Sequence, residues 1–158
     1  MEKVLSNMVN QFLHASQWCY KHGFLKGGEL FERLMIIFCS AHISGRANIH
    51  HNVSFSHEGI GVIVHPMCEI ADGCVINTKV TLGNGYPHGG APKLGKCVYV
   101  GSGAFVGGGI SIADNVIIGA NSVVTRSIES EGVVVAGCPA KIIRTLTKEE
   151  LKMRSSYH

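Results

Sequence analysis

Histidine is the residue type in this chain best suited to chemistry near neutral pH, and the histidines are unevenly spread. An imidazole titrates close to physiological pH, so it can take a proton from a hydroxyl group during a reaction. Six of the nine histidines lie between residues 42 and 88, namely His42, His50, His51, His57, His65 and His88. The sequence therefore predicts a general base within this segment.

The cysteines and the charge narrow the class of protein. The six cysteines form no CxxC pair, so we interpret them as free thiols that are mostly structural. The formal net charge is +3 without a block of Lys or Arg. That balance argues against a nucleic-acid partner but leaves room for a local phosphate pocket. The cysteines are Cys19, Cys39, Cys68, Cys74, Cys97 and Cys138.

Aliphatic residues recur every six positions through most of the chain. Neither an alternating strand nor an α-helix has this period, whereas hexapeptide β-helices do. Three hexapeptides would form one triangular coil with the aliphatic side chain inside. Three extra residues near 58–61 interrupt the period. It includes Ile43, Ile49, Phe55, Val64, Ile70, Ile76, Leu82, Leu94, Val100, Val106, Ile112, Ile118 and Val124.

Small residues support the same interpretation. Cys68 and Cys74 fall at the fifth repeat position, where a small buried side chain is expected. Glycine often follows the aliphatic residue, and we expect it to allow a tight or positive-φ corner. These glycines, part of 20 in the chain, are Gly83, Gly95, Gly101, Gly107 and Gly119.

The chain divides into three segments around this period. Residues 1–40 have apolar positions at helical spacing (4, 5, 8, 9, 12 and 13, then 30, 34, 37 and 38), with Gly27 and Gly28 as the predicted break between two helices. Residues 41–146 form the predicted β-helix, which a Gly- and Pro-rich segment, 83–93, should leave as an extended loop. Residues 147–158 begin with a Thr147-Lys-Glu-Glu150 capping box and predict a short final helix.

The repeat, the loop and the closing motif Val134-Val-Ala-Gly-Cys-Pro-Ala-Lys-Ile-Ile-Arg144 resemble those of the left-handed β-helix acetyltransferases. Within that superfamily the chain is most similar to the serine acetyltransferase branch. Gly61-Val-Ile-Val-His-Pro, Ala71-Asp-Gly73 and Val80-Thr-Leu-Gly83 match that branch in order and spacing over about residues 40–146. The resemblance implies a left-handed parallel β-helix, acetyl-CoA as co-substrate, and a homotrimer or a dimer of trimers.

The resemblance also implies roles for two histidines. Aligned on Val80-Thr-Leu-Gly83, Ser56-His57 falls on the Asp-His pair that holds the base in serine acetyltransferases, so His57 is the first candidate. His88 lies in the extended loop, where related enzymes place an active-site histidine that reaches the acceptor or acts as the base itself.

A set of small and basic residues corresponds to the acetyl-CoA site of the sugar-acetylating relatives. Small residues on successive coils would let pantetheine lie along a groove, and the cations would meet the phosphates. The implied set is Ser102, Ala104, Ala120, Thr125, Arg126, Lys141 and Arg144.

The acceptor is less well defined, because the chain departs from the serine enzymes where they hold their substrate. The Asp that orients the base is replaced by His42, the Asp before the base by Ser56, and an Arg-His pair by Gly90-Ala91. We therefore predict an O-acetyltransferase for a sugar or glycan precursor, with L-serine as the alternative acceptor. The chain ends without the Ile-tipped tail of the serine enzymes, so no docking to cysteine synthase is expected.

The same sequence bears on two alternative functions and on the location of the protein. A zinc carbonic anhydrase on the same fold fits poorly, because a closely spaced histidine pair on one strand is missing. The remaining alternative is a catalytically inactive oligomeric scaffold. The longest apolar run, Leu34 to Cys39, is too short for a membrane span, and no secretory signal precedes it, so a cytoplasmic protein without a metal is expected.

Overall fold

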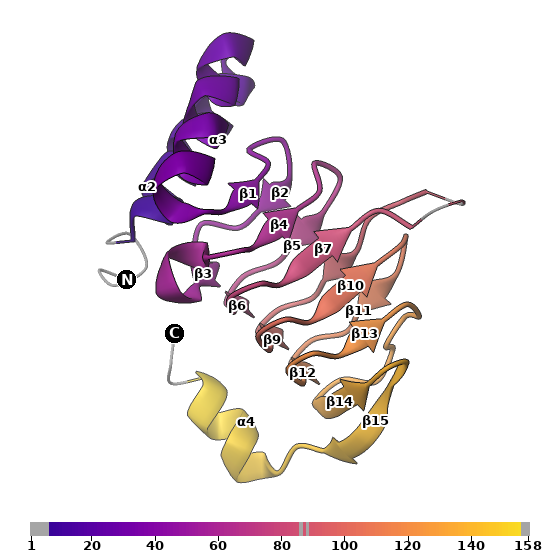
Figure 1. Ribbon diagram of the computed structural model, residues 1–158. Coiled ribbons are helices and arrows are strands. Elements are labelled where there is room, and N and C mark those ends of the chain that lie inside the picture. The colour runs from indigo at the N-terminus through magenta and orange to yellow at the C-terminus, as the bar shows by residue number, and fades with distance from the viewer. Residues whose placement is uncertain (1–6, 86, 88, 156–158) are drawn as a thin grey trace.

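A three-sided parallel β-helix forms the body of the molecule (Figure 1). The computed structural model describes residues 7–85, 87 and 89–155. Sheet A contains β1 (His42–Ile43), β4 (Ile63–Val64), β7 (Thr81–Gly83), β10 (Phe105–Gly107) and β13 (Val123–Val124). Sheet B contains β2 (Asn48–Ile49), β5 (Glu69–Ile70), β8 (Lys93–Leu94) and β11 (Ser111–Ile112). Sheet C contains β3 (Ser54–Phe55), β6 (Val75–Ile76), β9 (Tyr99–Val100), β12 (Ile117–Ile118), β14 (Val133–Gly137) and β15 (Ala140–Thr145).

The predicted six-residue period builds this helix. Every aliphatic position of the period, Phe55 included, is at most 7% exposed, while the residue before it faces outward or lies half-buried. Successive coils stack in register, as in the parallel pairing of Ile76 with Val100. Cys68 and Cys74 are buried as predicted, and burial raises their thiol pKa values to about 11 and about 12. The predicted β-helix is therefore confirmed.

The corners use glycine differently from the prediction. Positive φ angles occur at the fourth repeat position, at residues such as Lys79, Gly103 and Asn121. The glycines after the aliphatic residue have no positive φ, so that part of the prediction was wrong. Gly101 shows their actual role, because a Cβ there would lie 2.6 Å from the backbone nitrogen of Ala120 on the next coil. Close stacking of coils excludes a side chain at this position.

Two antiparallel helices, α2 (Met8–Lys21) and α3 (Leu25–Cys39), cover the first coil (Figure 1). The helix break lies at Gly23, which has φ 80°, so the predicted break at Gly27-Gly28 was wrong. Gly28 instead lies inside α3, where a Cβ would meet the Tyr20 ring at 2.6 Å. Close helix packing therefore requires this glycine. The predicted helical positions 4 and 5 fall outside the described residues.

Side chains of α2 tie the helices to the first coil. Asn10 Nδ2 donates to the carbonyl of Val53 at 3.4 Å, and Gln17 Nε2 donates to the carbonyl of Ile49 at 3.2 Å. The backbone N–H of Val9 donates to Glu58 at 3.1 Å. The first two bonds pair carbonyl groups of the first coil, and the third pairs a backbone N–H in the first turn of α2.

The other end of the coil is closed by the β14–β15 hairpin and the helix α4 (Lys148–Ser155). The predicted capping box is present, because the N–H of Glu150 donates to Thr147 Oγ1 at 3.2 Å and the N–H of Thr147 donates to Glu150 at 2.8 Å. No helix in the described ranges is long and apolar enough to cross a membrane.

Between β7 and β8 the chain leaves the coil, as predicted, and returns after nine residues. The stem of this loop packs on the next coil, where a Cβ on Gly85 would lie 2.6 Å from Cα of Gly108 and one on Gly90 would lie 2.8 Å from Cα of Gly109. Glycines on both sides therefore permit the contact. His88 falls outside the described residues.

Candidate functional site

The corner between sheets C and A carries three of the predicted site residues, His57, Ser102 and Ala120, and the last two stack in one line. Each lies two positions after the buried residue of a sheet C strand, and those strands pair in register. Successive strands of a sheet are about 4.8 Å apart, so three coils span roughly 14 Å. The line consists of Thr78, Ser102 and Ala120 and is called the C–A column below. On the preceding coil the matching position is Ile60, whose carbonyl accepts the N–H of Lys79, and His57 lies three residues earlier on the same corner.

Contacts between neighbouring coils hold the C–A column together. Thr78 Oγ1 donates to Ser102 Oγ at 3.3 Å, and the N–H of Asn121 donates to the carbonyl of Ser102 at 2.9 Å. Ser102 and Ala120 are exposed and Thr78 is half-buried. Below His57 the column is therefore an uncharged strip of small side chains, along which an extended ligand could lie.

Thr78 is the member of the column that the sequence analysis missed. It occupies the same repeat position as Ser102 but stands 24 residues earlier, because the extended loop intervenes. If the residues that the loop adds are subtracted from this 24-residue spacing, the sequence alone identifies Thr78 as the equivalent of Ser102.

His57 lies on the same corner, on the coil before the first member of the C–A column. It lies in the short 3-10 segment η1 (Ser56–Gly59), which contains two residues of the three-residue interruption of the period. His57 has φ 52°, and its side chain is exposed. The next residue, Glu58, accepts the N–H of Val9, so the start of α2 anchors this corner. The imidazole is thus accessible on an anchored turn.

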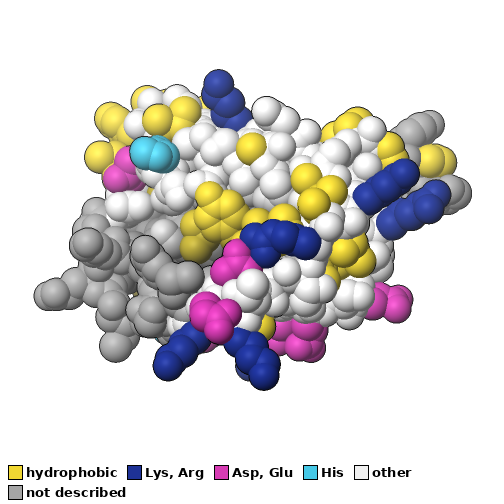
Figure 2. Space-filling model, turned by 90° about the horizontal axis from the view of Figure 1, so that it is seen from below, with side chains coloured by type: hydrophobic (Ala, Val, Ile, Leu, Met, Phe, Trp, Pro, Cys, Tyr) yellow, Lys and Arg dark blue, Asp and Glu magenta, His cyan; other side chains and the backbone are white. Residues whose placement is uncertain are grey.

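A second group of predicted residues meets at the far end of sheet A. Thr125, Arg126 and Lys141 line one hollow of about 370 Å³ between the end of β13 and the start of β15. Figure 2, which views the molecule from below, shows Lys and Arg side chains next to hydrophobic ones on this face. Both cations are exposed, so the hollow can receive an anionic group such as a phosphate.

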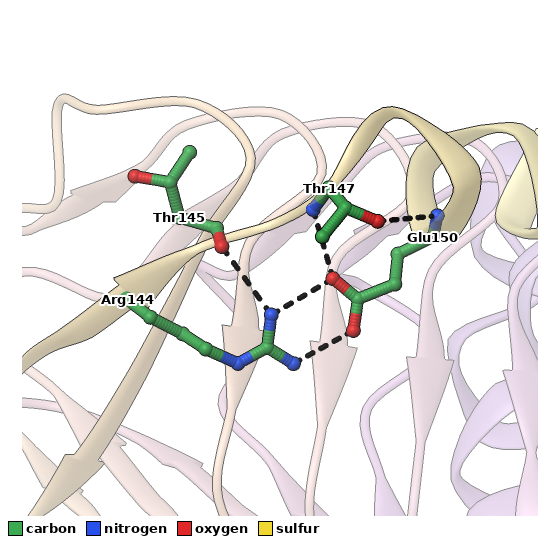
Figure 3. A network of polar contacts seen from close by, with 4 residues as sticks. All are labelled: Arg144, Thr145, Thr147 and Glu150. Carbon is green, nitrogen blue, oxygen red and sulfur yellow. Dashed lines mark hydrogen bonds and ion pairs between the residues drawn. The ribbon is translucent and has the colours of Figure 1, made fainter.

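Arg144 and Ala104 lie apart from this hollow. The Arg144 guanidinium donates to both carboxylate oxygens of Glu150, at 2.7 and 2.8 Å, and to the carbonyl of Thr145 at 3.3 Å (Figure 3). This bonding lowers the pKa of Glu150 to about 2. Ala104 is 1% exposed, and its backbone groups bond to Gly101 and Thr81, so it lies in the core away from any ligand surface.

His50 and His51 lie on a different corner. Nδ1 of His50 is 3.1 Å from a carboxylate oxygen of Asp72, and its ring centroid is 4.2 Å from that of His51. Both belong to the corner between sheets B and C. Among the described residues, no group of three His, Cys, Asp or Glu side chains is arranged to hold a metal ion.

A hollow of about 430 Å³ lies under α3 on the first coils of sheet A. His42 and His65 line it from the coil, Tyr20 and Glu32 line it from the helices, and Asn84 at the root of the extended loop forms part of its rim. Its lining mixes aromatic, acidic, amide and imidazole groups with the guanidinium of Arg46. Such a surface suits a small polar molecule with several hydroxyl groups.

The comparisons with known proteins point to one class. Residues 91–126 match the family model described as bacterial transferase hexapeptide (six repeats). No curated protein matches the chain. The fold and the repeat are those of the hexapeptide acetyltransferases, as the sequence analysis predicted.

Among solved structures, the chain is similar to serine acetyltransferases. The enzyme from Brucella abortus strain S19 in complex with coenzyme A has a TM-score of 0.82 and 28% identity, covering 87% of this chain and 55% of that one. The enzyme from Vibrio cholerae O1 biovar El Tor N16961 has a TM-score of 0.83 and 25% identity, covering 90% of this chain and 55% of that one. The enzyme from Neisseria gonorrhoeae has a TM-score of 0.81 and 26% identity, covering 92% of this chain and 57% of that one. The chain thus spans little more than half the length of these proteins.

Proposed function

We propose that this protein is an acetyl-CoA-dependent O-acetyltransferase in which His57 is the general base. The observation that carries the proposal is the corner between sheets C and A, which carries an accessible imidazole on the coil next to the small residues Thr78, Ser102 and Ala120. A pantetheine arm lying along these residues would bring its thioester toward His57. The serine acetyltransferase solved with coenzyme A, which shares this fold, supports acetyl-CoA as the donor.

The proposed reaction is a direct transfer. Neutral His57 takes the proton from an acceptor hydroxyl while the oxygen attacks the thioester carbonyl carbon. The tetrahedral intermediate collapses, the carbon–sulfur bond breaks, and the coenzyme A thiolate leaves and receives the proton from the imidazolium. Thr125, Arg126 and Lys141 bind the phosphates of the coenzyme, and His88 reaches the acceptor from the loop.

We assign a sugar or glycan precursor as the acceptor. The hollow under α3 contains His42, at the position where serine enzymes carry an Asp, and its polar lining can hydrogen-bond a polyhydroxylated ligand, with Arg46 pairing with Glu29 at its edge. The loop stem at Gly90 and Ala91 offers no ionic side chain to a carboxylate. L-Serine is the second candidate, favoured by the similarity to serine acetyltransferases.

The assembly that we propose is a homotrimer. The C–A column and the hollow lined by Thr125, Arg126 and Lys141 lie at opposite edges of sheet A. The outward residues of this sheet include Ile63 and Phe105. A partner coil against this face would enclose a ligand that reaches from one edge to the other. The same trimer is implied by resemblance to the family.

A coenzyme A release assay with a panel of acceptors tests the proposal. We expect turnover with nucleotide sugars or glycan fragments and weaker turnover with free L-serine. Strong turnover on serine alone would overturn the sugar assignment while keeping the acetyltransferase. Failure to bind acetyl-CoA by calorimetry would instead favour the inactive scaffold, and stoichiometric zinc would revive the carbonic anhydrase alternative.

A further inference from the structure

The turn between α2 and α3 exposes a compact group of large apolar side chains. Trp18, Phe24 and Leu25 are 55%, 58% and 56% exposed, and the Trp18 and Phe24 rings stack with centroids 5.9 Å apart. The N–H of Phe24 donates to the carbonyl of Cys19 at 2.9 Å, so the turn is held in place. Exposed aromatic residues grouped in this way mark an interaction surface.

Positive charge surrounds these apolar side chains. Residues 8–28 contain no Asp or Glu, whereas Lys21 and Lys26 flank the turn. Within the described part of the chain, neither lysine lies within ion-pair distance of a carboxylate. We call Trp18, Lys21, Phe24, Leu25 and Lys26 together the hairpin tip.

The acidic residues of α3 face the coil instead. Glu32 accepts the N–H of Gly45 at 2.8 Å and the hydroxyl of Ser44 at 3.2 Å. Glu29 lies 3.9 Å from the guanidinium of Arg46, which itself packs over the Tyr20 ring. The Glu32 carboxylate is thereby directed toward the coil, and Glu29, which pairs with Arg46 of the coil, also lines the surface beside Lys26 without an ion pair to it.

A shallow hollow continues the basic surface along α3. It has a volume of about 420 Å³ and is lined by Lys26, Leu30, Arg33 and Glu29. Lys26 and Arg33 are separated by about 10 Å along the helix. The hollow can therefore receive an anionic headgroup between two cations, next to the apolar side chain of Leu30.

We propose that the hairpin tip binds the surface of an anionic lipid membrane. Trp and Phe lie at the boundary between headgroups and acyl chains, while flanking lysines attract anionic lipids. A second copy fits less well, because two-fold pairing of tips would place Lys21 and Lys26 against their own equivalents. The proposal concerns peripheral binding and does not depend on the proposed acetyl transfer.

The chain contains a single tryptophan, Trp18, so its fluorescence reports on the tip directly. We expect the emission of the full chain to shift to shorter wavelength with vesicles of equimolar phosphatidylcholine and phosphatidylglycerol, and to remain unchanged with phosphatidylcholine alone. Added salt should reverse the shift. Lys21→Gln/Lys26→Gln should weaken partitioning by roughly thirtyfold, about fivefold for each cation.

A matched control removes the same charge elsewhere. Lys96→Gln/Lys148→Gln changes two exposed lysines away from the tip and should leave partitioning unchanged. Equal loss in both double variants, or the absence of a shift with anionic vesicles, would overturn the proposal. A concentration-dependent shift without vesicles, with an increase in mass by light scattering, would assign the tip to a second copy and also overturn it.

Discussion

His57 is the residue on which the proposed proton transfer depends. Removing a positioned general base typically lowers a rate by about 10²- to 10⁴-fold. We therefore expect His57→Ala to lower kcat by at least about a hundredfold, with little change in stability because the side chain is exposed. His51→Ala, an exposed histidine on another corner, serves as the control. Activity close to that of the unchanged protein would move the base to His88.

The substitutions that separate this chain from the serine enzymes are visible in the sequence, but their physical basis is not. Gly90 has φ 83°, and a Cβ there would lie 2.8 Å from Cα of Gly109 on the next coil. An arginine at this position would therefore strain the backbone and displace the coil. The missing ionic partner is a consequence of how the loop stem packs, which only the three-dimensional structure shows.

The strands were predictable from the sequence and the helix break was not, for reasons that differ in kind. A strand of the coil repeats one local rule, a buried aliphatic residue every six positions, so periodicity alone identifies it. The break between α2 and α3 lies instead at one positive-φ residue, Gly23, while the Gly27-Gly28 pair that suggested a break lies inside α3, where Gly28 packs closely against Tyr20. The C–A column was predicted in part, because Thr78 becomes visible only when strand register is known.

The attachment of α2 to the coil should depend on pH. Burial, and next the nearby His51, lower the pKa of His14, while Asp72 faces His50 at the same corner. A lowered pKa means that the unfolded chain binds the proton more tightly. The stability from neutral His14 is therefore complete above about pH 6.5 and falls as the pH drops from there toward the lowered pKa.

Urea unfolding at pH 7 and pH 5 measures this dependence. The unchanged protein should lose stability at pH 5, and His14→Gln should lose less over the same range. The contact between His50 and Asp72 is present in both proteins, so it cancels in the comparison. His42→Gln, an exposed histidine on β1, should behave like the unchanged protein. An equal loss in His14→Gln would exclude His14 as the cause.

The three corners of the β-helix carry different chemistry at the same repeat position. On the corner between sheets B and C these positions are titratable on every coil, with His51, Asp72, Lys96 and Asp114. On the corner between sheets A and B the extended loop interrupts the stacking. The corner between sheets C and A alone, among the described residues, combines a histidine with small uncharged residues on the coils that follow. The molecule therefore has one corner suited to a long neutral arm such as pantetheine.

This difference between corners can be tested by introducing a tyrosine at equivalent positions of two corners. Ala120→Tyr places a bulky ring on the C–A column, and Lys96→Tyr places the same ring at the equivalent position between sheets B and C. Both positions are exposed, so both variants should keep their stability within about 0.5 kcal/mol. Only Ala120→Tyr should raise the KM for acetyl-CoA, by about tenfold or more, because the ring occupies the path of the pantetheine arm. If both variants raise the KM equally, or neither does, the coenzyme lies elsewhere on the coil.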